Sequence, residues 1–265
     1  WANCGASQFH LPYGETAQVL PGSVGLRYDS LEPLRERLAS DNYNTCFASI
    51  KELPNGGVEI IDNYGNAFCC REKKSLTTHE RKQPVVGIHD TDEFGIVATK
   101  YGCTESECRG IDYVEIKCPP NTAKQIALFY DSVLDATTSV ISHGDDQICM
   151  VAIGEVHENG QSSQSLLFRE TTEALPPYDG HHLAIYVGSC KEDFEQAFQN
   201  ANIAGVVWVN PRFKDDVTTL QGARHWKQFR FKDIVNMETG DVIMELEHEV
   251  RSIEHDSWPG DKMVD

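Results

Sequence analysis

Histidine and glutamate side chains that could bind a metal or move protons lie in two stretches that have the pattern of β-strands. His181 and His182 begin one apolar run, and Glu245, Glu247 and Glu249 alternate along the other. Residues two apart on a strand share a face, so the glutamates would present their carboxylates together. Imidazole and carboxylate groups bind divalent transition metals and serve as acids or bases. Two plainer interpretations stay open: a loop–strand junction with one exposed and one packed imidazole, and an exposed sheet face for the glutamates.

The elements that carry these residues recur in the order strand, helix, then further strands. The first unit starts at residue 22, the second at 110 and the third at 180. Helices are expected at 31–39, capped by Ser30, at 122–134, capped by Asn121, and at 191–200. Strands are expected at 22–28, 46–53, 58–62, 67–71, 111–117, 139–142, 147–153, 164–170, 182–187, 206–209, 228–234 and 242–249.

The composition excludes some classes of partner. With 40% hydrophobic residues the chain resembles an ordinary globular protein. The net charge of −18 argues against nucleic acid and against anionic membrane surfaces, because few basic groups are available to bind phosphates. No apolar run approaches the roughly 18 residues of a membrane-spanning helix. The start at Trp1, without a methionine, suggests a processed or trimmed N-terminus, from which a targeting segment could have been removed.

The nine cysteines are odd in number and irregular in spacing, unlike a secreted disulfide framework. Cys69, Cys118 and Cys149 lie in apolar strand-like runs, where a thiol behaves as a small hydrophobic group. Cys103 and Cys108 could form a local disulfide or bind a soft metal, but unpaired surface thiols are the favoured interpretation. We therefore expect a reducing intracellular compartment, either the cytosol or an organelle matrix such as a plastid.

Four local sequences carry a family resemblance. They are IDYVEIKCPPNTAKQIALFYDSVLDA from residue 111, GHHLAIYV from 180, DIVNMETGDVIMELEHE from 233 and DNYGNAFCC from 62. The first resembles the first strand of a module together with the helix that follows it, and the second resembles the first strand alone. The last two resemble a turn that leads into the last strand of a module. Their order resembles the vicinal-oxygen-chelate superfamily, which includes glyoxalases, extradiol dioxygenases and bleomycin-resistance proteins. The resemblance covers roughly residues 6–72 and 107–250.

This resemblance implies an α+β fold of tandem βαβββ modules that form curved mixed sheets with helices on the outer face. Residues 107–250 are expected to form a paired-module domain. Residues 1–72 would form a partial domain, in which a strand at 6–11 lacks a helix before it. The polar segment 73–106 would link the two domains, and 251–265 would form a tail.

In the superfamily a divalent metal is typically held by residues of the first and last strands of two paired modules. By that pattern His182 would be a first-strand ligand and Glu245 a last-strand ligand. Tyr113 stands where the preceding module would have a His or Gln, and no carboxylate falls clearly at its last-strand position. Glu115 shares a face with Tyr113 and Glu247 with Glu245, so a His, Glu, Glu set suited to iron, manganese, nickel or zinc could result. Tyr113 or Glu115 could instead be the acid–base group.

Two functions follow from the resemblance. One is a metal-dependent glyoxalase-type enzyme (isomerase, lyase or dioxygenase) that acts on a small oxygen-rich molecule. The other is a metal-free small-molecule-binding protein, or a structural subunit of a larger assembly, which retains the fold without the catalytic site. A protein partner or a homo-oligomer could cover the N-terminal edge strand. The expected pocket walls are Phe168, Tyr186, Phe229 and Phe231.

Overall fold

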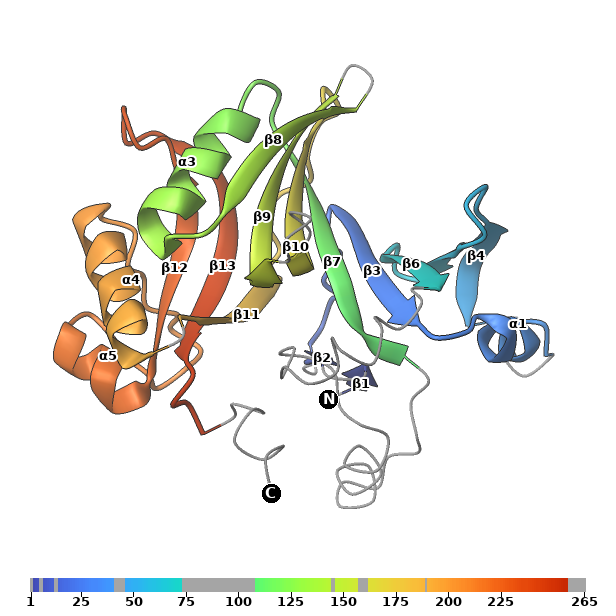
Figure 1. Ribbon diagram of the computed structural model, residues 1–265, viewed down its shortest axis with the longest axis horizontal. Coiled ribbons are helices and arrows are strands. Elements are labelled where there is room, and N and C mark those ends of the chain that lie inside the picture. The colour runs from blue at the N-terminus through green and yellow to red at the C-terminus, as the bar shows by residue number, and fades with distance from the viewer. Residues whose placement is uncertain are drawn as a thin grey trace. The chain divides into compact units, whose positions relative to one another are not determined.

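The computed structural model describes residues 2–4, 7–11, 14–40, 46–72, 108–143, 146–156, 162–188 and 190–256. Its contacts divide the chain into two compact units. The first consists mainly of residues 1–116 and 152–166, and the second of 117–151 and 167–264. In Figure 1 the blue and teal elements belong to the first unit and the orange and red elements to the second.

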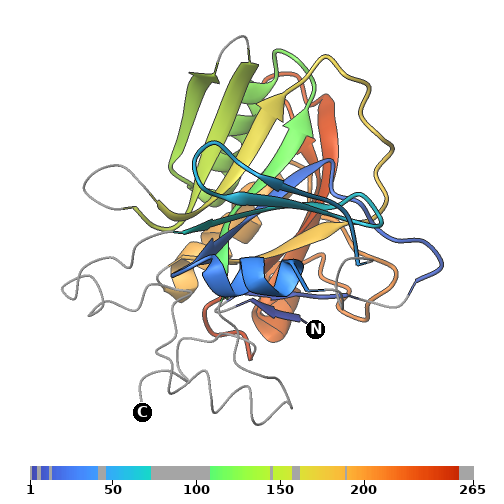
Figure 2. The ribbon, with the colours of Figure 1, turned by 90° about the vertical axis from the view of Figure 1, so that its right-hand side faces the viewer.

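The first unit contains one complete βαβββ module. β3 (Gly22–Tyr28) is followed by α1 (Glu32–Leu38), β4 (Phe47–Glu52), β5 (Val58–Asp62) and β6 (Ala67–Glu72). The strand order is β4-β5-β6-β3, with β3 parallel to β6 and the other pairs antiparallel. β7 (Cys108–Cys118) lies antiparallel on the other side of β3. Figure 2 views this module from the side of α1.

Helix α1 is shorter than predicted and begins differently. Its N-cap is Leu31 rather than the predicted Ser30, whose hydroxyl oxygen accepts from the Glu32 N–H at 3.3 Å. The Leu31 N–H donates to the Glu72 carboxylate at 2.7 Å. Pro33 lies in the first turn of the helix. A backbone N–H at this position would have no hydrogen-bond partner inside the helix, so proline removes no helical hydrogen bond.

The N-terminal strand predicted at 6–11 is observed as β2 (Ser7–Phe9). It pairs antiparallel with β1 (Ala2–Cys4) in a two-stranded sheet. Cys4 and Phe9 belong to the hydrophobic core of the first unit, together with Leu26, Leu31, Val58, Ile60, Cys70 and Cys108.

A second module follows in the order β7, α3 (Ala123–Leu134), β8 (Thr138–His143), β9 (Asp146–Val156) and β10 (Ser162–Glu170). Helix α3 begins one residue later than predicted. Its N-cap is Thr122 rather than Asn121, and the Ala123 N–H donates to the Glu170 carboxylate at 2.8 Å. The apolar stripe of α3 is buried as its periodicity predicts.

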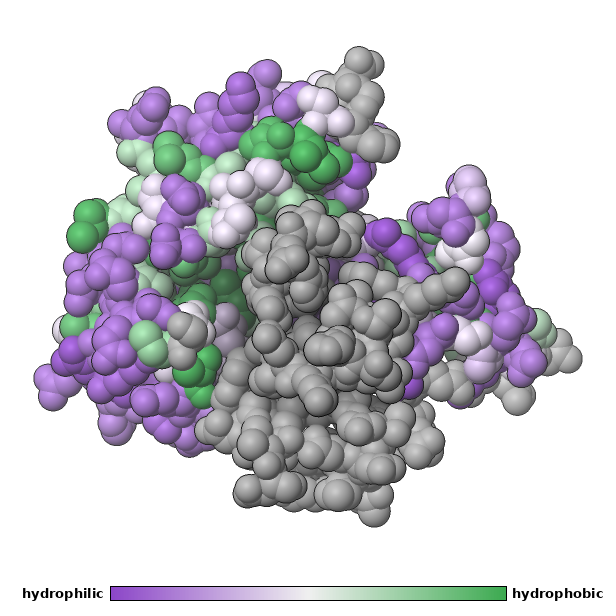
Figure 3. Space-filling model, in the orientation of Figure 1, coloured by the Kyte–Doolittle hydropathy of each residue, from purple (hydrophilic) through white to green (hydrophobic). Residues whose placement is uncertain are grey.

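The third module belongs entirely to the second unit. It consists of β11 (His182–Val187), α4 (Lys191–Ile203), α5 (Leu220–Trp226), β12 (Gln228–Val235) and β13 (Val242–Ser252). β13 is the central strand, parallel to β11 and antiparallel to β12. Figure 3 shows mainly hydrophilic residues on the outer side of α4 and α5.

The largest differences from the prediction in the third module concern one strand and one helix. The strand predicted at 206–209 is reduced to one bridge between Val207 and Phe231, and α5 was not predicted. The Thr219 hydroxyl oxygen caps α5 by accepting from the Gly222 N–H at 3.1 Å. The α+β class and the mixed curved sheet are confirmed. The predicted linker, 73–106, lies outside the described residues, and β13 extends into the predicted tail.

No helix in the described parts of the chain has both the length and the apolar character needed to cross a membrane.

Candidate functional site

The sheet of the third module has an apolar face and a charged face. On β13, Leu246, His248 and Val250 are completely buried, and Phe229 and Phe231 of β12 are buried with them. The rings of Phe194 and Phe198 on α4 pack against Phe229, so this face is the one that α4 covers. Alternation along each strand sends charged and polar residues to the opposite face, called the charged face below: Glu245, Glu247, Glu249 and Arg251 of β13, and Gln228, Arg230 and Lys232 of β12.

His248 is buried on the apolar face as a neutral imidazole. Its Nδ1 donates to the Leu246 carbonyl at 2.8 Å, and its Nε2 accepts from the Tyr130 hydroxyl at 2.6 Å. The ring stacks on Phe231 with 4.2 Å between centroids. Burial lowers the pKa of His248 to about 3 and raises the pKa of Tyr130 well above its usual value. Both groups therefore hold the core together in their uncharged forms.

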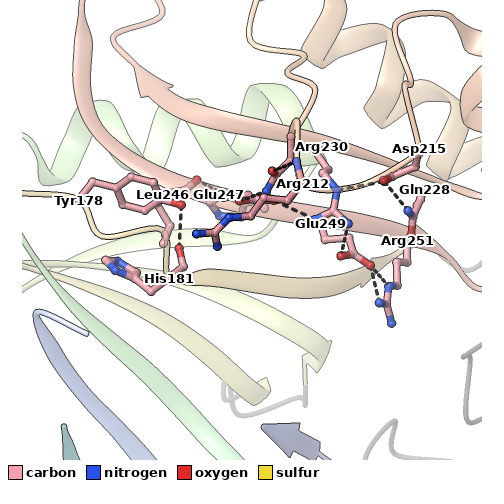
Figure 4. A network of polar contacts seen from close by, with 12 residues as sticks. Tyr178, His181, Arg212, Asp215, Gln228, Arg230, Leu246, Glu247, Glu249 and Arg251 are labelled. Atoms are coloured by element: carbon pink, nitrogen blue, oxygen red, sulfur yellow. Dashed lines mark hydrogen bonds and ion pairs between the residues drawn. The ribbon is translucent and has the colours of Figure 1, made fainter. Parts of the chain in front are cut away.

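Arg230 is the centre of a buried ionic network on the charged face (Figure 4). Its Nε donates to Asp215 at 3.0 Å, its Nη1 to Glu247 at 2.9 Å, and its Nη2 lies 2.5 Å from Glu249. The Arg230 side chain is only 4% exposed, and those of the three carboxylates are 3–7% exposed. The Phe213 ring covers the guanidinium at 4.3 Å. Water is therefore largely excluded from this cluster, and each carboxylate has a charge-assisted contact.

Further partners surround this network. Asn210 Nδ2 donates to both oxygens of Glu247 at 2.9 Å, and Gln228 Nε2 donates to Asp215 at 2.6 Å. Arg251 pairs with Glu249 and donates to the Tyr186 hydroxyl at 3.2 Å.

The charge state of Glu249 follows from these contacts. Burial alone would raise the pKa of Glu249, but Arg251 and Arg230 outweigh it and hold that pKa below its usual value. Glu249 therefore stays ionised at neutral pH.

The predicted ligands of the third module lie near this network. His182 is half-buried at the start of β11, in register with Glu247 across the parallel pair. The Glu245 side chain is 43% exposed and forms an ion pair with Lys232. The register therefore places Glu247, two residues further along β13, directly across from His182.

Tyr113 and Glu115 belong to the first unit and lie on β7, opposite Gly25 and Ser23 of β3. Arg71 lies over the Tyr113 ring, 4.7 Å from its centroid. Burial and the Cys69 side chain raise the pKa of Tyr113, and Arg71 only partly opposes this shift. The phenol is therefore protonated at neutral pH.

The predicted pocket residues fall into two groups. Phe168, Phe229 and Phe231 are completely buried, and their rings pack in the core of the second unit against Tyr130, Phe194 and Phe129 respectively. Tyr186 lies half-buried on the charged face, where it contacts Arg251. Of the four, Tyr186 is the one that shares a face with the ionic network.

His181 is a further candidate for a metal ligand or a base, and the sequence alone did not distinguish it from His182. Its Nδ1 lies 2.6 Å from Asp179, and because a carboxylate only accepts, this nitrogen is the donor. Its carbonyl accepts from the Tyr178 hydroxyl at 2.9 Å. The Nε2 atom is buried and has no hydrogen-bond partner among the described residues. An imidazole oriented by a carboxylate in this way can accept a proton or bind a metal. The signal in the sequence is an aspartate two residues before the histidine.

The charged face fits a divalent cation poorly. Both oxygens of Glu247 are taken by Asn210, one of them also by Arg230, and Glu245 is paired with Lys232. The carboxylates that surround Arg230 already neutralise a positive charge. In the described ranges no group of three or more His, Cys, Asp and Glu residues has the geometry to hold a metal ion.

Comparison with known proteins gives matches among solved structures alone. No protein-family model and no curated protein matches the chain. Glyoxalase I from Zea mays matches at 11% identity, with 87% of this chain and 66% of that chain covered and a TM-score of 0.47. A putative dioxygenase from Bacillus subtilis matches at 13% identity, with 94% and 68% covered and a TM-score of 0.49. The fosfomycin resistance protein FosX from Listeria monocytogenes matches at 12% identity, with 54% and 90% covered and a TM-score of 0.34.

The chain therefore spans about two thirds of the length of the maize enzyme. At these identities the likeness concerns the fold and carries no reaction with it. Among the matched structures are a glyoxalase I and a putative dioxygenase, which are kinds of protein that the resemblance in the sequence names.

Proposed function

We propose that this chain is a metal-free protein of the glyoxalase-like fold, which binds a small molecule or serves as a subunit of a larger assembly. The observation that carries the proposal is the engagement of Arg230 by Asp215, Glu247 and Glu249. A buried guanidinium with three carboxylate contacts supplies the positive charge that these groups need. A divalent cation at the same carboxylates would have to displace it.

Elemental analysis tests this proposal directly. The protein is purified without chelators, then incubated with iron(II), manganese, nickel or zinc and freed of excess metal. We expect far less than one metal per chain, with no difference between the native protein and the His182→Ala and Glu245→Gln variants. The matched control is Glu238→Gln, which removes the same charge from an exposed turn residue. Near-stoichiometric metal that His182→Ala or Glu245→Gln removes, and Glu238→Gln does not, would overturn the proposal.

The second candidate is a metal-dependent glyoxalase-type enzyme, and the orientation of His181 favours it. Histidines that bind metals commonly donate their second ring nitrogen to a carboxylate, as His181 does to Asp179. In this alternative His181 or His182 would bind the metal with Glu245. A small oxygen-rich substrate would coordinate the open positions of the metal. Loss of bound metal in His181→Ala or Asp179→Asn would support the enzyme.

A further inference from the structure

Two buried thiols of the first unit lie unusually close together. The Sγ atoms of Cys4 on β1 and Cys108 on β7 are 2.7 Å apart, although 104 positions separate them in the sequence. A disulfide has an S–S bond of about 2.05 Å, so a movement of less than about 1 Å would bring the sulfurs to bonding distance. Both residues are buried, at 4% and 5% exposure, in the core that also contains Cys70.

The contact between Cys4 and Cys108 connects β7 to β1, which belongs to a short and separate pair of strands. β1 and β2 form a separate two-stranded sheet of three paired positions. Its polar contacts to the rest of the first unit include the Ser7 hydroxyl, which accepts from the Ile111 N–H and from Gln164, both at 3.2 Å. Such contacts are individually weak and a short pair of strands is marginally stable. A covalent bond between Cys4 and Cys108 would hold this pair of strands on β7.

We propose that Cys4 and Cys108 form a disulfide when the protein meets a disulfide oxidant such as oxidised glutathione, and that this bond locks the β1–β2 pair onto β7. The inference is independent of the proposed function. It revises the expectation that the cysteines are unpaired, and it assigns Cys108 a partner other than Cys103, which lies outside the described residues.

The reaction is two successive thiol–disulfide exchanges. The Cys108 thiolate attacks one sulfur of oxidised glutathione, which forms a mixed disulfide and releases one glutathione thiolate. Cys4, after losing its proton, attacks the Cys108 sulfur and releases the second glutathione thiolate. The two protein thiols lose two electrons and two protons, and the two glutathione molecules take them up as thiols.

The surroundings favour this order of attack. Contact with Cys4 holds the pKa of Cys108 below its ordinary value, and the same contact raises the pKa of Cys4. The thiolate therefore forms first at Cys108, and the thiolate is the nucleophile. Because both sulfurs are buried, the β1–β2 pair must open to admit the oxidant. The reaction should thus be slower than modification of the exposed Cys46.

The test is peptide mapping by mass spectrometry. Reduced protein is treated with oxidised glutathione, denatured, alkylated and digested. We expect one cross-linked peptide that contains Cys4 and Cys108, with neither of these two cysteines alkylated. The melting temperature should rise on oxidation, because a long loop of the unfolded chain is closed.

Four variants give this test its specificity. Cys4→Ser and Cys108→Ser should each lose the cross-linked peptide and the rise in melting temperature. Cys46→Ser, an exposed thiol of the same unit, and Cys70→Ser, a buried neighbour, should keep both. Quantitative alkylation of Cys4 and Cys108 after oxidation would overturn the proposal. So would mixed disulfides with glutathione alone, or a bond from either residue to another cysteine.

Discussion

Replacement of Arg230 by methionine would remove the positive centre of the charged face while keeping a long side chain. Asp215, Glu247 and Glu249 would stay buried, but each would lose an ionic contact of 2.5–3.0 Å. Removing one partner of a buried ion pair costs about 3–5 kcal/mol, because the remaining charge is left without compensation. Since three carboxylates share this arginine, we expect a loss at the upper end of that range at pH 7. The melting temperature should fall by on the order of 10 °C.

The assay is equilibrium denaturation in urea at a series of pH values. In the native protein the folded pKa of Glu249 is depressed. Its contribution to stability is therefore present above the unfolded pKa of about 4.3 and is lost as the pH falls through the lower folded value. In Arg230→Met, the guanidinium no longer opposes the effect of burial on the Glu249 carboxyl, so protonation of that group is favoured more than in the native protein. The difference in stability between the two proteins should accordingly shrink as the pH falls from 7 to 4.

Two control variants separate burial from charge. Lys232→Met breaks a partly exposed pair with Glu245 and should cost about 0–1 kcal/mol. Arg251→Met removes one of the two arginines at Glu249 but leaves Arg230 in place, so its cost should be intermediate. A loss below about 1 kcal/mol for Arg230→Met at pH 7 would refute the reasoning. An undiminished difference at pH 4 would refute its electrostatic part.

Three further perturbations test the packing inside each unit, and their effects are measured by thermal or urea denaturation. Gly25→Ala would place a Cβ 2.2 Å from the Tyr113 ring and should cost about 1–3 kcal/mol, whereas Gly14→Ala, whose nearest contact is 3.4 Å away, should cost little. Tyr130→Phe leaves the buried Nε2 of His248 without its donor, with an expected cost of about 1–3 kcal/mol. His248 has a folded pKa depressed to about 3, so its contribution is complete above about pH 6.5 and is lost as the pH falls. Between about pH 6.5 and about pH 3 the free energy of unfolding should fall by at most about 1.4 kcal/mol per pH unit because of His248. A His248→Gln variant should lack this pH dependence.

Periodic elements of the fold could be predicted from the sequence. The strand at 182–187 is observed with the predicted limits, and α3 begins one residue later than predicted. A seven-residue helix such as α5 contains too few turns for a clear apolar period. The segment at 206–209 has an apolar sequence typical of a strand, but its pairing is limited to one bridge and the Trp208 N–H bond to Arg230. Pairing of this kind depends on tertiary contacts that the local sequence does not contain.

The candidate site was harder to predict than the elements that carry it. Alternation correctly indicated that Glu247 and Glu249 share a face, but not which cation they meet. The identity of the cation depends on the antiparallel register of β12 and β13, which places Arg230 opposite Glu249. It also depends on a loop that brings Asp215 to the same guanidinium, and loop conformations have no periodic signal. The choice between two adjacent histidines likewise depended on a turn that binds the His181 ring to Asp179.

Buried carboxylates on one face of a sheet require a positive charge, and a metal ion and a guanidinium are alternative ways to supply it. A metal leaves when its concentration falls, whereas Arg230 is covalently part of the strand next to β13. Pairing of β12 with β13 therefore brings Arg230 to Glu247 and Glu249, and the loop that carries Asp215 completes the network. Arg230 and a metal at these carboxylates would also compete, so Arg230→Met should expose Glu247, Glu249 and Asp215 to divalent cations. If the variant is stabilised by added manganese or zinc and the native protein is not, the guanidinium occupies the place of a cation. If neither protein responds, the network serves the stability of the fold alone.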